Sequence, residues 1–151
     1  MIDWARLRPY NSTVHRSFEE LCYHIARLRY GDLGVFTSID DSGGGDGVEF
    51  YLTFPSGEQW GWQAKWYFPS PRFSDDRKRS IRGSLVRACE QHPELTHWFL
   101  CMPTNLTPDR KGEQAWFDNT LPDDIPAGRI VELAHWGDSS FNSWLIRLVA
   151  E

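Results

Sequence analysis

The feature that most constrains the fold of this sequence is a pair of β-prone runs joined by three turn-forming residues. Residues 48–54 and 59–66 are rich in aromatic and β-branched residues and flank the turn Pro55-Ser56-Gly57. Together they predict an antiparallel hairpin centred on Ser56. In that register Glu49 lies opposite Gln63, since each is seven residues from Ser56.

The hairpin predicts a cluster of polar side chains on one face of the sheet. Gln63 and Lys65 are two apart on one strand and therefore point to the same side. Glu49, directly across from Gln63, has its Cβ atom about 4.5–5.5 Å away. A register slip of one residue turns Glu49 to the other face and removes the arrangement. Two polar residues in a strand that also carries Trp62 and Ala64 are costly to bury unless they serve a function.

Hydrophobic periodicity places the remaining elements. Helices are expected over residues 13–29, 74–91 and 112–121, with a last helix that carries Phe141, Trp144, Leu145 and Leu148. Further strands are expected over residues 33–39, 97–102 and 130–133. The predicted order is αβββαβαβα, an α/β domain with a mixed central sheet flanked by helices.

The boundaries of the first helix are marked by capping signals. Spacings of three and four place its start near residue 13, but Ser17 with Glu20 also reads as a capping box, which would start it four residues later. Gly31 is expected to end it.

Length and composition limit the class of protein. A chain of 151 residues with 40% hydrophobic and 25% charged residues fits one globular domain. Its longest apolar runs are too short for a membrane span, and its start lacks a signal-peptide pattern, so a cytoplasmic location is expected. The three cysteines, Cys22, Cys89 and Cys101, are expected to be buried free thiols. The five histidines show no metal-binding spacing and are expected in surface or core roles.

The charge distribution is uneven. The net charge of −5 does not mark a nucleic-acid binder by itself, but six of the 16 basic residues fall within residues 72–87. They are Arg72, Arg77, Lys78, Arg79, Arg82 and Arg87. Two interpretations of this segment are equally supported: a face that contacts phosphates, or a helix face that is simply exposed to solvent.

Three short motifs resemble one nuclease family. They are Phe18-Glu19 in the first helix, Gly45-Asp46-Gly47-Val48-Glu49 at the start of a strand, and Trp62-Gln63-Ala64-Lys65 on the next strand. Together they resemble the Mrr-like branch of the PD-(D/E)XK nuclease superfamily over roughly residues 15–105. They also resemble the N-terminal nuclease effector domains fused to STAND-type NTPases (Avs-type) in antiphage defence.

The resemblance implies a set of site residues. Glu49 would be the main metal carboxylate and Lys65 the catalytic lysine. Gln63 would offer a neutral oxygen in place of the second acid common in the family, and Glu19 would restore the missing charge. The turn has one glycine fewer than the family pattern, so Asp46 remains an alternative ligand to Glu49. The position of Glu49 across from Gln63 favours Glu49.

The resemblance also implies an activity. It predicts an endonuclease that hydrolyses phosphodiester bonds of double-stranded DNA with Mg²⁺ (or Mn²⁺) and with little sequence specificity. Arg77, Lys78, Arg79 and Arg82 would contact phosphates. The domain, residues 1–151, would act as the effector part of a longer antiviral protein that oligomerises through domains outside this chain. Two alternatives remain: a catalytically silent nucleic-acid-binding module of the same fold, and an RNA nuclease.

Overall fold

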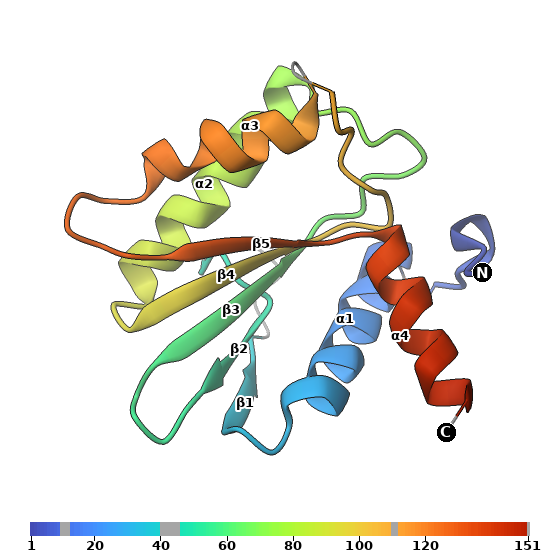
Figure 1. The fold of residues 1–151 in the computed structure, drawn as a ribbon, viewed down its shortest axis with the longest axis horizontal. Coiled ribbons are helices and arrows are strands. Elements are labelled where there is room, and N and C mark those ends of the chain that lie inside the picture. Colours follow the sequence, from blue (N-terminus) through green and yellow to red (C-terminus); the bar gives the residue numbers. More distant parts are fainter. Residues whose placement is uncertain (10–12, 40–45, 110–111, 151) are drawn as a thin grey trace.

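The computed structural model describes residues 1–9, 13–39, 46–109 and 112–150, the last three without their side chains. Figure 1 shows a single sheet between two layers of helices. Gly45, at the start of the glycine-rich motif, lies outside the described residues.

The described elements follow the predicted order. The helices are α1 (Val14–Tyr30), α2 (Asp75–Gln91), α3 (Glu113–Asn119) and α4 (Asp138–Ala150), with short 3-10 turns at Trp4–Arg6 and Leu121–Asp124. The strands are β1 (Val35–Ser38), β2 (Phe50–Thr53), β3 (Gln59–Ala64), β4 (Leu95–Cys101) and β5 (Glu132–Trp136). The prediction αβββαβαβα is therefore confirmed.

The sheet is mixed, with the strands in sequence order from β1 to β5. β1, β2 and β3 are antiparallel neighbours, whereas β3, β4 and β5 run parallel. In the hairpin Phe50 pairs with Trp62 and Thr53 with Gln59, which is the register expected about Ser56. The carboxyl ends of β3, β4 and β5 therefore meet at one edge, together with the amino end of β2.

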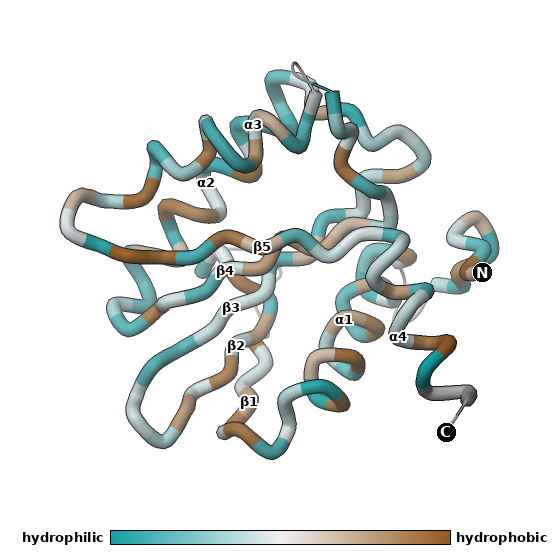
Figure 2. Tube along the Cα trace, in the orientation of Figure 1, coloured by the Kyte–Doolittle hydropathy of each residue, from teal (hydrophilic) through white to brown (hydrophobic). Residues whose placement is uncertain are grey.

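Each face of the sheet has its own hydrophobic core. Helices α1 and α4 cover one face, and their core includes Phe18, Trp62 and Phe141. Helices α2 and α3 cover the other, whose core includes Leu85 and Trp98. Figure 2 shows hydrophobic residues along the strands between these layers. Alternation along β3 sends Trp62 and Ala64 to the first core, so Gln63 points to the α2 side.

Helix α1 begins at the earlier of the two predicted positions. Thr13 is its N-cap, and the Thr13 side chain accepts a hydrogen bond from the backbone nitrogen of Arg16. Ser17 is buried one turn inside the helix, so the capping box at Ser17 is wrong. The earlier start gives α1 an additional turn that carries His15. Gly31 ends the helix as expected.

Gly47 joins the hairpin closely to α2. Its φ is +74°, and a Cβ atom there would lie 2.0 Å from the Ser84 carbonyl oxygen and 2.5 Å from the Ala88 nitrogen. The Gly47 carbonyl also accepts a hydrogen bond of 3.1 Å from the buried Trp98 indole. Only glycine fits this backbone conformation and this contact, which fixes the chain two residues before Glu49.

The late strands differ from the prediction at their ends. β4 begins at Leu95, two residues earlier than expected, and β5 is shifted to Glu132–Trp136. Pairing with β4 sets these limits, since His97 aligns with Glu132 and Cys101 with Trp136. Ile130, part of the predicted strand, is 90% exposed and lies outside the ladder. None of the helices in the described part of the chain is long and apolar enough to span a bilayer.

Candidate metal centre

Glu49 and Gln63 meet at the end of the hairpin. The Glu49 backbone nitrogen donates to the Trp62 carbonyl at 2.7 Å, although Trp62 is already paired with Phe50, so the register shifts by one residue at Glu49. The Gln63 Nε2 donates to Glu49 Oε1 at 2.9 Å. The two side chains therefore meet as expected, but the regular pairing that was expected to set Glu49 opposite Gln63 ends at Phe50 and Trp62.

The amide oxygen of Gln63 is the least satisfied atom of this pair. Gln63 is 4% exposed, and its Oε1 has no hydrogen-bond partner among the described residues. A buried carbonyl-type oxygen without a donor costs free energy unless something else binds it. A cation beside Glu49 can fill this role.

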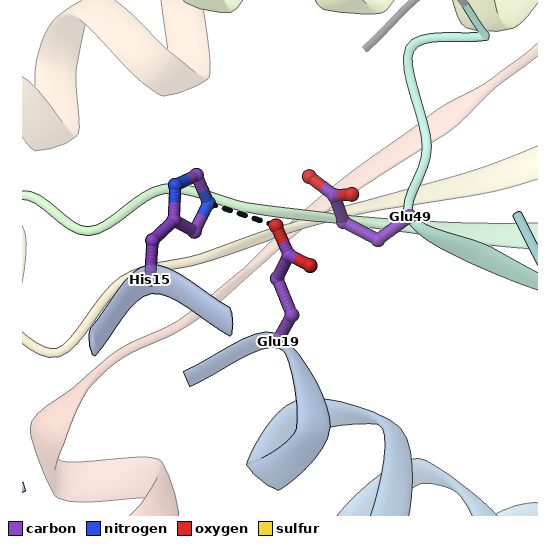
Figure 3. A group of neighbouring side chains, drawn as sticks. All are labelled: His15, Glu19 and Glu49. Atoms are coloured by element: carbon purple, nitrogen blue, oxygen red, sulfur yellow. Dashed lines mark ion pairs between the residues drawn. The ribbon is translucent and has the colours of Figure 1, made fainter. Parts of the chain in front are cut away.

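Helix α1 adds two more side chains at the same edge of the sheet. His15 and Glu19 are one helical turn apart, and their side chains point toward Glu49 in Figure 3. One ligand atom from each of His15, Glu19 and Glu49 lies within 4.8 Å of the others. The His15 Nε2 is 3.1 Å from Glu19 Oε1 and 3.2 Å from the Ala64 carbonyl oxygen. Arg16 holds the second Glu19 oxygen at 3.7 Å.

Lys65 lies beside the pair, directly after β3. Its backbone nitrogen donates to the Cys101 carbonyl at 2.8 Å, so it still follows the parallel ladder. Its Nζ donates to Ser80 Oγ of α2 at 2.9 Å. Burial lowers the pKa of Lys65, the nearby Glu49 carboxylate raises it in part, and Arg87 lowers it further. Lys65 is thus a half-buried ammonium held next to the carboxylates.

Glu49 has an unfavourable electrostatic environment. Burial, and then the Glu19 carboxylate, raise the pKa of Glu49 to about 7, against the opposing effects of Lys65, Gln63 and Arg16. Two carboxylates converge here with too little positive charge to offset their burial. A divalent cation between them would offset both the burial and the repulsion that raise this pKa.

Asp46 lies apart from this cluster. Its Oδ2 is 3.4 Å from Nε2 of His92, the residue that caps the end of α2. His92 in turn contacts Gln59 Oε1 at 3.2 Å, near the opposite end of β3. Of the two candidate carboxylates, the structure brings Glu49 and not Asp46 to Glu19 and Gln63.

The predicted phosphate-contacting residues are spread around α2. Arg79 pairs with Asp76 at 2.7 Å, and Arg82 holds both oxygens of Asp124 at 2.6 and 3.1 Å. Lys78 lies over the Trp116 ring of α3. Arg77 lies over the Tyr67 ring, 4.3 Å from its centroid, and donates to the Ser70 and Arg72 carbonyls. Of the four, Arg77 alone has the i, i+3 spacing to Ser80 that places both residues on one face of α2.

Sequence reasoning missed His15. The residue forms an i, i+4 pair with Glu19, which places both on one face of a helix. That spacing, together with the assignment of Glu19 to the site, was a usable signal. It was weak because the same helix contains a second such pair, Glu20 with His24, which lies at the surface.

The fold and the side chains at the end of β3 define an α/β protein with a mixed five-stranded sheet and a partly buried cluster of carboxylate, amide, imidazole and ammonium groups. No protein-family model, curated protein or solved structure matches the chain.

Proposed function

We propose that the chain is a divalent-metal-dependent nuclease that hydrolyses phosphodiester bonds of double-stranded DNA. The observation that carries the proposal is the convergence of Glu49, Gln63 and Lys65 at the end of β3, with Glu19 supplied by α1. Oxygen donors of this kind suit Mg²⁺ and Mn²⁺. The unpartnered Gln63 oxygen and the raised pKa of Glu49 both favour a bound cation.

Each side chain has a distinct role in such a reaction. Glu49 and Glu19 would hold the cation, and the Gln63 oxygen would be a further ligand. A divalent ion at this point lowers the pKa of a bound water and neutralises charge on the phosphate. Lys65 hydrogen-bonds the attacking water or the anionic phosphoryl oxygen, where a fixed positive charge stabilises the transition state.

Contacts to the phosphate backbone account for binding of a long substrate. Arg77 is three residues before Ser80 and is therefore the one of these four cations that lies on the same face of α2 as Ser80. Arg77 and Lys78 contact carbonyls or a ring rather than carboxylates. To contact phosphates, Arg79 would have to break its ion pair with Asp76, and Arg82 its ion pair with Asp124. Binding through so few cations is weak, salt-dependent and indifferent to sequence.

The biological role we propose is that of an effector in antiviral defence. It is supported by the resemblance of the motifs around Glu19, Glu49 and Lys65 to the Mrr-like effectors. Assembly through domains outside this chain would raise local nuclease concentration and compensate for weak DNA binding.

The test is a cleavage assay on the purified chain. Supercoiled plasmid, single-stranded DNA and structured RNA are incubated with Mg²⁺, with Mn²⁺, or with EDTA. Plasmid cleavage is expected with the metals only. Lys65→Met, which keeps the length of the side chain without its charge, is expected to lower the rate by about 100-fold or more. Arg27→Met, which removes an exposed positive charge near the other end of α1, is the control and is expected to retain most of the activity.

The outcomes separate the alternatives. Cleavage of RNA but not DNA would assign the site to RNA. Nucleic-acid binding without cleavage in either metal would identify a silent binding module. Equal rates for wild type and Lys65→Met would remove Lys65 from the mechanism and overturn the site.

A further inference from the structure

His15 lies at the candidate metal centre without a role in the nuclease assignment. It is on the first turn of α1, and its side chain is 45% exposed. Its Nε2 faces Glu19 Oε1 at 3.1 Å and the Ala64 carbonyl at 3.2 Å. Figure 3 shows the imidazole directed toward the Glu19 carboxylate, with the Glu49 carboxylate beyond it.

The spacing of the three side chains fits one ion after small movements. Mg²⁺ or Mn²⁺ in octahedral geometry, with bonds of about 2.1 Å, sets neighbouring ligands about 3 Å apart and opposite ones about 4 Å apart. The atoms of His15, Glu19 and Glu49 lie within 4.8 Å of one another. A rotation of one carboxylate group would bring these atoms from the observed spacing to the spacing that one ion requires. The buried, unpartnered Oε1 of Gln63, whose amide is hydrogen-bonded to Glu49, independently indicates a missing positive partner at this point.

We propose that His15 Nε2 is a fourth protein ligand beside Glu19, Glu49 and Gln63, and that this nitrogen makes the site select Mn²⁺ over Mg²⁺. The inference rests on the metal site of the proposed function and specifies its ion. Mg²⁺ binds oxygen almost always, whereas Mn²⁺ also accepts imidazole nitrogen. A site with one imidazole, two carboxylates and an amide oxygen therefore loses binding energy with Mg²⁺ that it keeps with Mn²⁺.

Helix α1 contains a second histidine–glutamate pair, His24 with Glu20, which lies at the surface. His24 Nε2 is 3.4 Å from Glu20 Oε2, also at i, i+4, with side chains 65% and 49% exposed. Glu19, in contrast, is 19% exposed and faces the buried Glu49. The two pairs have the same local chemistry, so they provide an internal control. Only the His15 pair has a third ligand and an unpartnered amide beside it.

The experiment measures metal affinity and not cleavage. The chain is stripped with EDTA and titrated with Mn²⁺, followed by the loss of the free-ion EPR signal, and with Mg²⁺ by competition. His15→Gln replaces the nitrogen by a neutral oxygen donor; His24→Gln makes the same change at the control pair. His15→Gln is expected to weaken Mn²⁺ binding by about tenfold or more, with little change for Mg²⁺. His24→Gln is expected to change neither.

A spectroscopic measurement on the wild-type chain provides a second test, and its main result does not require that a variant folds. Pulsed EPR of Mn²⁺ bound to the wild-type chain is expected to show coupling to an imidazole nitrogen, and His15→Gln is expected to abolish it. No nitrogen coupling in the wild type, or equal Mn²⁺ affinity in wild type and His15→Gln, would overturn the inference while leaving an oxygen-only nuclease site intact. Binding of Mn²⁺ through His15 without any cleavage would support the inference and contradict the nuclease. Absence of binding of either ion would overturn both.

Discussion

Two glutamates at opposite ends of the same hairpin differ in how their charge is satisfied. Glu58 precedes β3 and accepts hydrogen bonds from the Thr96 hydroxyl at 2.6 Å and the Trp60 indole at 3.0 Å. These bonds lower the pKa of Glu58. Glu49 precedes β2 at the other end, and burial raises its pKa to about 7. The two carboxylates have opposite shifts within one hairpin.

Their neighbours extend the contrast. We call Glu58, Thr96, His97 and Glu132 the far-end cluster. In it His97 lies 3.0 Å from Glu132 Oε2 and 3.8 Å from Glu58 Oε2, so an imidazole separates two exposed carboxylates. At the other end Glu49 approaches Glu19, and Gln63 keeps an oxygen without a donor. A cluster with its hydrogen bonds complete stabilises the fold, whereas an incomplete one fits a ligand.

The largest expected effect is on catalysis. Glu49→Gln removes the carboxylate that faces Gln63, and plasmid cleavage in Mn²⁺ is expected to fall by about 100- to 1000-fold. Glu58→Gln, the same change at the far end, is expected to stay within about twofold, because it touches no metal ligand. Rates from initial nicking of supercoiled plasmid provide the measurement. Equal losses in the two variants would show that the ends do not differ in function.

One glycine at each end of the hairpin, Gly47 near Glu49 and Gly57 beside Glu58, allows the two ends to be compared for their effect on stability. Gly47→Ala places a Cβ against the backbone of α2 at a positive φ and is expected to lower the free energy of unfolding by about 3 kcal/mol or more. Gly57 also has a positive φ, of +93°, but nothing lies within 4 Å of its Cβ position. Gly57→Ala is therefore expected to cost about 1–2 kcal/mol, from backbone strain alone. Urea titration measures both, and a Gly57→Ala loss as large as that of Gly47→Ala would remove the role of the α2 contact.

The pH dependence of stability should have opposite signs at the two ends. The folded pKa of Glu49, about 7, lies above its unfolded value of 4.5, so its stabilising contribution is full below pH 4.5 and is lost as the pH rises to 7. In EDTA, wild type is expected to lose up to about 3 kcal/mol relative to Glu49→Gln across this window. The lowered pKa of Glu58 predicts the reverse, a contribution lost as the pH falls below 4.5.

Urea titrations at a series of pH values, each compared with its glutamine variant, measure these differences. Parallel curves for wild type and Glu49→Gln between pH 4.5 and 7 would contradict the raised pKa. Addition of Mn²⁺ is expected to stabilise wild type more than Glu49→Gln, because the ion binds the folded site.

The smallest effect is expected at the far-end cluster. Glu132 is 74% exposed, and its pair with His97 lies at the surface. Glu132→Gln is expected to lower the free energy of unfolding by less than about 1 kcal/mol and to leave Mn²⁺ affinity unchanged. Thermal unfolding and the EPR titration check this. A change in Mn²⁺ affinity would show that the far-end cluster also binds metal.

Much of the fold was predictable because its signals are local. The period of two in β2 and β3 and the turn at Ser56 fixed the pairing of Phe50 with Trp62. The spacing of apolar residues located α1 and α2 to within one residue. The start of α1 was ambiguous because Thr13 and Ser17 both make suitable caps. The cap at Thr13 gives α1 the earlier turn, which leaves Ser17 inside the helix.

The candidate site was only partly predictable. The shared face of Gln63 and Lys65 follows from side-chain alternation along one strand. The contact of Glu49 with Gln63 was also expected, but it forms where the hairpin register shifts by one residue. The meeting of Glu49 with His15 and Glu19, and the separation of Asp46 toward His92, depend on how α1 and α2 dock on the sheet. Docking results from contacts between distant segments, such as Phe18 with Phe141 and Gly47 with α2. The sequence by itself thus determined one face of a hairpin, and tertiary packing decided which helical side chains complete it.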